Sequence, residues 1–222
     1  MTNSLILKTG DKVARGVQRS VYLHPHDPTK LVKVLNRPQD MARRHNFNGW
    51  IDHLFPSTRV RQIRKEYKEY MRVALNNQYS GFSAPISHMY GFAFTNLGLG
   101  CITERVANAD GSLGKTLGSK VRDADLHDAD IALLNDCIAK IYAHDIRASD
   151  MNPENFVFGR RSNGDTAGPR ECVLVDGFGD THAIPVRSMA RWSNRMGLND
   201  SCARLARNTR LHWHPQRKTF SR

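Results

Sequence analysis

A short polar run in the second half of the chain has the residue types and the spacing that phosphoryl transfer requires. It reads SDMNPEN over residues 149–155, and Asp176 follows later at the end of an apolar run. Asp150 is suited to accept the proton of an acceptor hydroxyl, because a well-placed carboxylate acts as a general base. Asn155 and Asp176 offer hard oxygen atoms, the ligands that Mg²⁺ prefers. The run therefore predicts a magnesium-dependent site that acts on phosphate groups.

Two residues of the first half extend this set. Lys33 lies within the apolar run 30–35, where strand alternation places it on the opposite face from Val32 and Val34. A lysine there is either an exposed strand residue or a cation for nucleotide phosphates. Glu66, on the predicted helix that follows, is able to reach Lys33 and hold it. Each residue alone has an ordinary explanation, a cap or a solvated side chain, but their order along the chain favours phosphoryl transfer.

The elements that must position these residues begin with a β-rich first half. Short strands are predicted at residues 5–7, 20–23, 30–35, 91–94 and 100–103. Residues 37–56 are predicted to be a long polar loop, and a helix is predicted from Ser57 to about Leu75. Apolar residues recur along that helix at steps of three and four, which predicts one buried stripe. They are Val60, Ile63, Tyr67, Met71 and Ala74.

The second half is mainly helical. A helix is predicted over residues 128–144, and two further helices at 187–196 and 201–211. The stripe of the first helix consists of Ile131, Leu134, Ile138 and Ile141. Strands predicted at 156–158 and 172–175 would form a hairpin that brings Asn155 and Asp176 together. The change of pattern near residues 104–108 predicts two parts, residues 1–105 and residues 106–222.

Composition limits the class of protein. The chain has 222 residues, of which 40% are apolar, and its net charge is +12. No run approaches the ~20 apolar residues that cross a bilayer, and the start of the chain lacks a signal-peptide core. The four scattered cysteines are interpreted as buried reduced thiols, so a cytoplasmic location is expected. Residues 186–222 hold nine Lys or Arg and one acid, which indicates either a solvated face or a surface for an anionic partner.

The order of Lys33, Glu66, Asp150, Asn155 and Asp176 resembles the signature set of protein kinases. More narrowly, the chain resembles the YrbL family, small bacterial kinase-like proteins associated by name with the PhoP regulatory network. The resembling segments are 22–25, 31–34, 64–67, 109–112, 151–157, 175–179 and 184–185. The resemblance implies an α+β, two-lobed protein-kinase-like fold. Its N-lobe is an antiparallel β-sheet plus one helix, and its C-lobe is reduced and mainly helical.

The resemblance also implies roles for further residues and the cofactors ATP and Mg²⁺. Gly16 and Val21 fall in the segment that corresponds to the phosphate-binding loop. Lys33 corresponds to the ligand of the α- and β-phosphates. The segment from Glu104 to Val106 corresponds to the hinge whose backbone holds adenine. Glu66 corresponds to the acid that orients the lysine, and the residues of the second half keep the roles given above.

The sequence also departs from the kinase pattern. Ala14 and Arg19 replace two glycines of the phosphate-binding loop, and Ala148 replaces the histidine before the catalytic aspartate. Asn152 stands in place of the loop lysine that contacts the transferred phosphate. Asp176 is followed by Gly-Phe-Gly, so the metal loop is one residue longer. There is no room for a long activation segment, which argues against a protein substrate.

Three functions fit these residues. The first is an ATP- and Mg²⁺-dependent phosphotransferase with an unknown hydroxyl acceptor. The second is a pseudokinase-type regulatory binding module, which keeps the fold and performs no transfer. The third is binding of nucleic acid or an anionic membrane by the basic tail alone, which predicts steep salt dependence. The presence of Asp150 favours the first, because a binding module does not need that carboxylate; nucleic acid is not the favoured partner.

Overall fold

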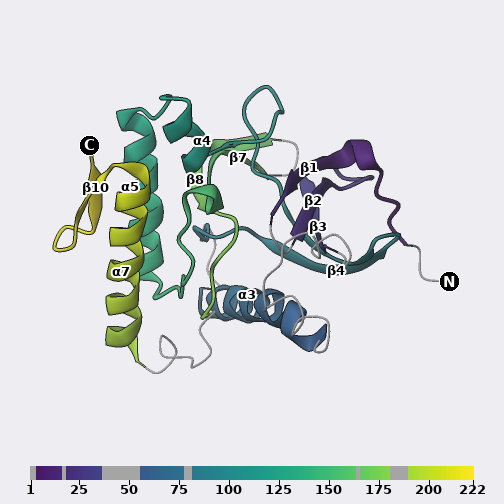
Figure 1. Cartoon of the computed structure of the whole chain (residues 1–222), viewed down its shortest axis with the longest axis horizontal. Coiled ribbons are helices and arrows are strands. Elements are labelled where there is room, and N and C mark those ends of the chain that lie inside the picture. Colours follow the sequence, from purple (N-terminus) through teal and green to yellow (C-terminus); the bar gives the residue numbers. More distant parts are fainter. Residues whose placement is uncertain (1–3, 17–18, 37–55, 78–81, 164–165, 181–189) are drawn as a thin grey trace, which may run out of the picture. The chain divides into compact units, whose positions relative to one another are not determined.

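The structure is a computed structural model that describes residues 4–16, 19–36, 56–77, 82–163, 166–180 and 190–222 (Figure 1). Contacts divide the chain into two units. Unit 1 consists of Met1–Arg64 and His88–Arg105, and unit 2 of Lys65–Ser87 and Val106–Arg222. The two units are described separately below. Most of the predicted loop at 37–56 lies outside the described residues.

Unit 1 contains a five-stranded antiparallel sheet in the order β1-β2-β3-β5-β4. A 3-10 turn, η1 (Thr9–Asp11), leads into the first strand. The strands are β1 (Lys12–Arg15), β2 (Arg19–Leu23), β3 (Lys30–Leu35), β4 (Met89–Thr95) and β5 (Gly98–Glu104). Four of the predicted strands are confirmed as β2 to β5, and the sequence pattern did not predict β1. The antiparallel sheet expected for the first half is therefore present.

The predicted strand at residues 5–7 is wrong. Leu5 forms only an isolated bridge with Thr95. Beyond it, the side chain of Asn96 takes the place of a neighbouring strand: its Oδ1 accepts from the Leu7 amide at 2.8 Å, and its Nδ2 donates to the Leu7 carbonyl at 3.1 Å. A side-chain amide that satisfies both backbone groups of Leu7 leaves no ladder to extend.

Helix α3 (Pro56–Asn76) confirms the predicted helix. Its side chains are described from Gln62 onward, and the buried ones are Ile63, Glu66, Glu69 and Val73. Met71, which the apolar pattern placed on the buried stripe, is exposed. The predicted stripe is therefore wrong in part, because the helix buries two glutamates that apolar periodicity does not detect.

Unit 2 contains a three-stranded sheet, β6-β7-β8, and a two-stranded hairpin near the end of the chain. Its elements are β6 (Lys115–Thr116), α4 (Leu117–Arg122), α5 (Asp128–Ala143), η2 (Pro153–Asn155), β7 (Phe156–Asn163), β8 (Thr166–Leu174), α7 (Arg191–Thr209), β9 (His212–His214) and β10 (Thr219–Ser221). Helix α5 and the β7–β8 hairpin confirm the predictions for the middle of the chain. The short elements α4, β6, β9 and β10 were not predicted.

The basic tail forms one continuous helix, α7, where the sequence pattern predicted two. Residues 187–189 of the first predicted helix lie outside the described residues. Helix α7 continues through Gly197 because Leu198, Cys202 and Leu205 on one face are fully buried. Packing of that face outweighs the weak helix propensity of glycine. The helix lies beside α5, since Tyr142 Oη donates to Asn199 Oδ1 at 2.6 Å.

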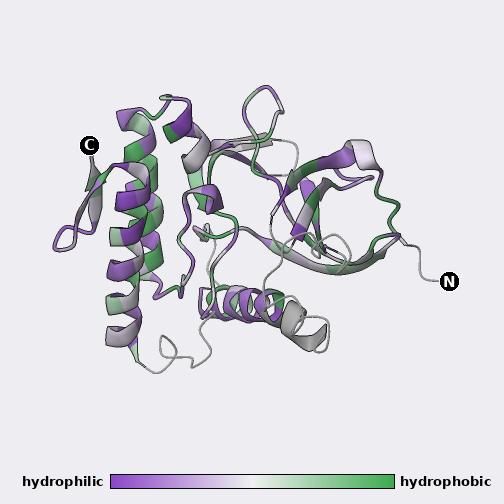
Figure 2. Ribbon diagram, viewed as in Figure 1, coloured by the Kyte–Doolittle hydropathy of each residue, from purple (hydrophilic) through white to green (hydrophobic). Residues whose placement is uncertain are grey.

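The core of unit 2 is centred on α5 and β8, which contact each other. The predicted stripe of α5 is buried at all four positions, Ile131, Leu134, Ile138 and Ile141. Figure 2 shows the alternation of hydrophobic and hydrophilic residues along α5 that this stripe produces. All four cysteines of the chain are buried thiols, as predicted. Burial raises the pKa of the Cys172 thiol well above its usual value, which keeps it protonated.

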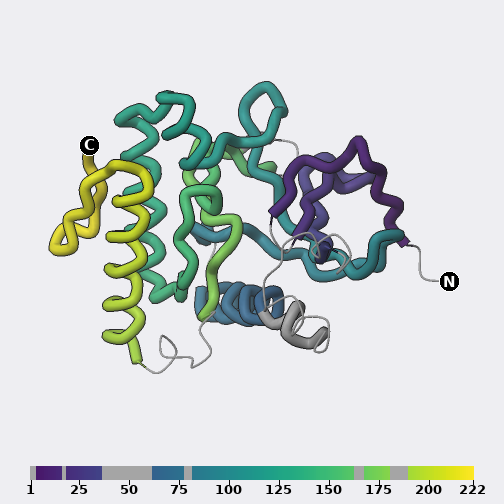
Figure 3. Tube along the Cα trace, viewed as in Figure 1, coloured from purple at the N-terminus to yellow at the C-terminus, as the bar shows by residue number. Residues whose placement is uncertain are grey.

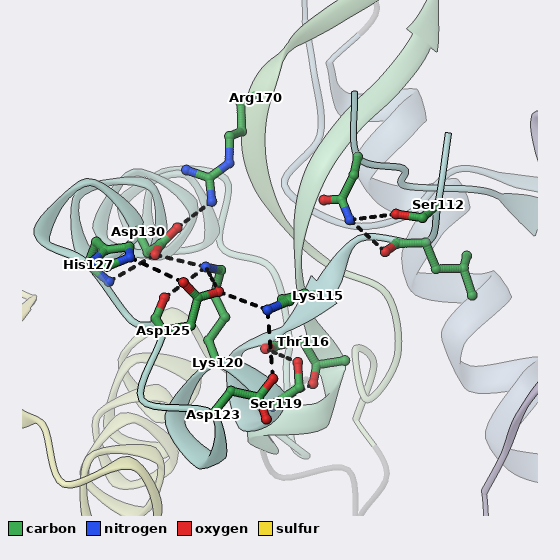
Figure 4. A network of polar contacts seen from close by, with 12 residues as sticks. Ser112, Lys115, Thr116, Ser119, Lys120, Asp123, Asp125, His127, Asp130 and Arg170 are labelled. Carbon is green, nitrogen blue, oxygen red and sulfur yellow. Dashed lines mark hydrogen bonds and ion pairs between the residues drawn. The ribbon is translucent and has the colours of Figure 1, made fainter. Parts of the chain in front are cut away.

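An ionic network joins α4, α5 and β8 (Figure 4). At its centre Asp130 is 1% exposed, and its carboxylate accepts from the Lys120 ammonium at 3.1 Å and from Arg170. The same carboxylate accepts from the His127 amide at 2.9 Å and so caps the start of α5. These partners, chiefly the His127 amide and Arg170, outweigh the effect of burial and lower the pKa of Asp130. The network therefore ties three elements of unit 2 together through one buried charge.

No helix in the described part of the chain is both long enough and apolar enough to span a membrane.

Candidate functional site

The predicted base lies in the segment between α5 and β7, which can be followed in Figure 3. The backbone of Asp150 is held on both sides. Its amide donates to the Gly177 carbonyl at 3.1 Å, and its own carbonyl accepts from Asn155 Nδ2 at 3.0 Å. Two hydrogen bonds to one residue fix its backbone in place. The exposed carboxyl group of Asp150 therefore projects from a rigid support.

The β7–β8 hairpin joins the two predicted metal ligands. Phe156 pairs with Leu174 in the antiparallel register, and one step further the Val175 amide donates to the Asn155 carbonyl at 2.8 Å. Asn155 and Asp176 thus stand at the same end of the hairpin, on either side of its last backbone bond. The structure brings Asp150, Asn155 and Asp176 into one region of unit 2.

The oxygen atoms of this region fit a magnesium ion. Because Asn155 donates through Nδ2, its amide is oriented with Oδ1 as the atom that remains for a metal. Asp176 Oδ1 accepts from the Gly177 amide at 2.8 Å, which orients the second ligand. Within the described residues, no group of three or more His, Cys, Asp or Glu gathers as a metal cage. One or two protein carboxylates or amides, completed by phosphates and waters, are typical of magnesium sites.

The electrostatics of Asp150 suit a proton acceptor. Partial burial raises the pKa of its carboxyl group, and repulsion from Asp176 raises it further. The guanidinium of Arg204, on α7, acts in the opposite direction. A carboxylate with a raised pKa is a stronger base than a solvated one, which favours proton transfer near neutral pH.

The segment that follows Asp176, one residue longer than in the kinase pattern, contains two glycines that its conformation requires. Gly177 has φ +78°, and a Cβ atom there would lie 2.2 Å from the Asp150 carbonyl oxygen. Gly179 has φ +93°, and its Cβ would lie 2.9 Å from the carbonyl oxygen of Lys65. Both positions require glycine, because the left-handed conformation and the close backbone approach each exclude a side chain. The second approach places the loop against the turn of α3 that carries Glu66, which is 2% exposed.

The loop that carries Asp150 is supported without the histidine that the kinase pattern has before this aspartate. Ala148, which stands in its place, forms bridges with Phe178 and Gly179. The Gly179 amide donates to the Arg147 carbonyl at 2.7 Å, and Ser149 Oγ donates to the Gly179 carbonyl at 2.8 Å. Backbone pairing and one hydroxyl therefore hold the loop.

Glu69 is a supporting residue that the sequence did not indicate. It is 3% exposed, and its Oε1 accepts from the Arg147 amide at 2.9 Å. The Arg147 guanidinium donates to Oε2 at 3.1 Å, and Arg72 forms a second ion pair with the same carboxylate at 2.6 Å. The sequence shows basic residues between Arg59 and Arg72 on this helix, but their presence does not indicate that Glu69 contacts a loop near residue 147.

The predicted residues of unit 1 lie on or beside its sheet. Lys33 is 7% exposed and is flanked in register by Val21 on β2 and Cys101 on β5. The Gly16 amide donates to the Arg19 carbonyl at 2.7 Å, which closes the β1–β2 connection. Residues 17–18 of that connection lie outside the described residues. Because Lys33 and Glu66 belong to different units, their pairing stays a prediction.

The predicted hinge runs across the boundary between the units. The Glu104 amide donates to the His88 carbonyl at 3.0 Å, and Glu104 Oε1 accepts from the His88 amide at 2.7 Å. The Val106 carbonyl accepts from the Gly114 amide at 3.0 Å. A role of this backbone in adenine binding stays a prediction.

Comparison with solved structures defines the class of fold. The kinase domain of Mycobacterium tuberculosis PknI, as a double mutant, matches with a TM-score of 0.50 and 16% identity, covering 89% of this chain and 71% of that one. A single mutant of the same domain matches with a TM-score of 0.48, 16% identity and coverages of 89% and 73%. The apo form of PpkA-294 matches with a TM-score of 0.46, 16% identity and coverages of 87% and 60%. The first match shows a protein-kinase-like fold, which confirms the predicted fold class.

The family follows from the sequence profile. Residues 5–210 match the family described as PhoP regulatory network protein YrbL, and the chain belongs to that family. The resemblance noted from the sequence segments is therefore confirmed. No curated protein matches the chain.

Proposed function

We propose that the chain is a small ATP- and Mg²⁺-dependent phosphotransferase that acts on a hydroxyl group. The observation that carries this proposal is the environment of Asp150: a carboxylate with a raised pKa, on a fixed backbone, beside two oxygen ligands suited to magnesium. A protein that only binds a partner gains nothing from a base held in this way. The kinase-like fold supports the proposal at the level of architecture alone.

Each residue then has a defined task. Asp150 accepts the proton of the acceptor hydroxyl as its oxygen attacks the γ-phosphorus. Asn155 and Asp176 would hold Mg²⁺, which neutralises the charge of the phosphates when bound. In unit 1, Lys33 is the proposed ligand of the α- and β-phosphates, with Glu66 as the acid that orients it. Gly16, Val21 and the backbone from Glu104 to Val106 belong to the same proposal as nucleotide contacts.

Thermal-shift measurements test the proposal directly. Wild-type protein is heated with ATP, ADP or GTP, each with and without Mg²⁺, in parallel with Asp176→Ala. We expect a rise in Tm that needs both nucleotide and magnesium, and that is lost in Asp176→Ala. Slow hydrolysis of ATP should follow the same pattern, and Lys33→Ala should weaken binding. Absence of any shift at saturating nucleotide and magnesium would overturn the proposal.

A pseudokinase-type binding module is the second candidate, and one observation favours it. The Asn152 side chain accepts from the Glu154 amide at 3.1 Å and so caps η2, where kinases have a loop lysine. The Asn152 side chain is therefore used to stabilise the start of η2. The variant Asp150→Asn distinguishes the two candidates, because a pure binder keeps its function when the base is removed.

The basic tail adds a proposed contact with an anionic partner in the cytoplasm. Arg191 and Arg195 are exposed along α7. Replacing both arginines with glutamine should weaken binding to the partner and flatten its salt dependence. The buried face of α7 is untouched by these substitutions, so unfolding is not expected to complicate the result.

A further inference from the structure

Arg204 is a basic residue of unit 2 that lies close to the proposed base, Asp150. Arg72 and Arg147 pair with Glu69, Arg122 pairs with Glu154, and Arg170 pairs with Asp130. For Arg204, the described residues offer no carboxylate within ion-pair distance. Arg204 is an exposed residue, although it lies in the region that contains the proposed base. A charged group kept without an acidic partner is available for an anionic ligand.

Two neighbours position this guanidinium. Nη2 of Arg204 donates to Ser201 Oγ at 3.0 Å and lies 3.4 Å from the Ser149 carbonyl oxygen. Ser149 immediately precedes Asp150, and α7 also contacts η2, which begins after Asn152. Arg204 therefore reaches the catalytic loop from outside it, from a helix that the sequence places far along the chain.

The negative charges near Asp150 favour a nearby cation. Asp150 and Asp176 repel each other, and a nucleotide would bring further negative charge. In kinases a loop lysine offsets charge on the transferred group, but here Asn152 is committed to capping η2. Arg204 is the cation that acts on Asp150 from α7, while Asp176 is the acid that acts on it from the loop after β8.

We propose that Arg204 is a catalytic residue that contacts the transferred phosphoryl group and replaces the missing loop lysine. This inference rests on the proposed phosphotransferase function. In the step concerned, the acceptor oxygen forms a bond to the γ-phosphorus as the bond from that phosphorus to the β,γ-bridging oxygen breaks. ADP leaves with the electron pair, and the hydroxyl proton passes to Asp150. Arg204 donates hydrogen bonds to the equatorial oxygens while negative charge spreads over them.

The test compares Arg204→Gln with Arg207→Gln, a matched control one turn further along α7 whose side chain is also exposed. Turnover is measured as ATP hydrolysis, with water as the acceptor. We expect Arg204→Gln to lower kcat by about 10²- to 10³-fold, as for loss of one donor to a transition state, with little change in KM. Arg207→Gln should behave as wild type. In Arg204→Gln, a lysine introduced by Asn152→Lys should restore part of the lost rate.

A second readout does not depend on turnover. Magnesium, ADP and aluminium fluoride imitate the planar transferred group, and wild type should gain more in Tm from this mixture than from magnesium and ADP. Arg204→Gln should lose this extra gain and keep the shift with magnesium and ADP.

The outcomes separate the two proposals. If wild type neither binds the magnesium nucleotide nor hydrolyses it, the phosphotransferase function and the role of Arg204 both fail. If wild type is active and Arg204→Gln matches Arg207→Gln in rate and in the fluoride-dependent shift, only the role of Arg204 fails. A fall in rate accompanied by loss of nucleotide binding, with no rescue by Asn152→Lys, would show that Arg204 merely holds the Ser149 carbonyl.

Discussion

Asp130 and Asp150 are two aspartates of unit 2 with opposite surroundings. Asp130 is enclosed by Lys120, Arg170 and a backbone amide, and its pKa is lowered (Figure 4). Asp150 has a partly buried carboxyl group near a second carboxylate, that of Asp176, and burial and then this repulsion raise its pKa. Saturation with partners makes the first carboxylate an anchor between elements. Asp150 lacks such partners, and its raised pKa suits proton exchange, so the two aspartates are expected to differ in role.

The largest expected effect comes from Asp150→Asn. If Asp150 is the base, hydrolysis of ATP should fall by about 10²- to 10⁴-fold. Stability should not fall. Because the folded pKa lies above the unfolded one, the ionised carboxylate destabilises the fold above that pKa, and a neutral amide removes this cost. Kinetics and thermal melting at neutral pH check both statements, and a loss of Tm would contradict the contrast with Asp130.

Asp130→Ala should produce the reverse result. Removing this carboxylate takes away the buried partner of the Lys120 ammonium and leaves it only Asp125, and breaking a buried ion pair costs about 3–5 kcal/mol. Denaturant unfolding measures the loss. Asp136→Ala is a suitable control, because its pair with Lys140 lies on the exposed side of the same helix. Equal stability of the two variants would show that the network of Asp130 is not an anchor.

Gly177→Ala tests how closely the segment after Asp176 packs against the backbone of Asp150. The added Cβ would meet the Asp150 carbonyl at 2.2 Å in a left-handed conformation, so we expect a loss of roughly 2–4 kcal/mol and displacement of the base. Gly111→Ala is the matched control. Its φ of +79° is nearly the same, but no atom lies within 4 Å, so only about 1 kcal/mol of strain is expected and activity should persist. Activity retained in Gly177→Ala would contradict the tight packing of this loop.

The smallest effect concerns the exposed edge of the ionic network. Hydrogen bonds from Lys115 and then Lys120 lower the pKa of Asp125 to about 2. A carboxylate with a lowered pKa stabilises the fold above its unfolded pKa, and this stability is lost as the pH falls through the folded pKa. The Tm difference between wild type and Asp125→Asn should therefore shrink from roughly pH 5 to about pH 2. A difference that stays constant over this range would exclude the ionic explanation.

Local sequence was enough to find the residues of one loop and one hairpin. Asp150, Asn155 and Asp176 lie at spacings that a short loop and a β-hairpin bring together, so their grouping followed from local rules. Glu69 and Arg204 act on the same loop from helices far along the chain, and no local pattern reports such contacts. Likewise the strand predicted at residues 5–7 failed because a side chain, Asn96, replaced a neighbouring strand.

Two backbone hydrogen bonds described above also determine how the site opens. The Asp150 amide donates to the Gly177 carbonyl and the Val175 amide to the Asn155 carbonyl, so each bond joins residues 149–155 to residues 175–179. Separation of the two segments would break both hydrogen bonds. Local unfolding should therefore expose both amides in a single event, and their hydrogen exchange should slow together when magnesium and nucleotide are added. If exchange at both amides slows by the same factor, these two amides report directly on whether the site is occupied.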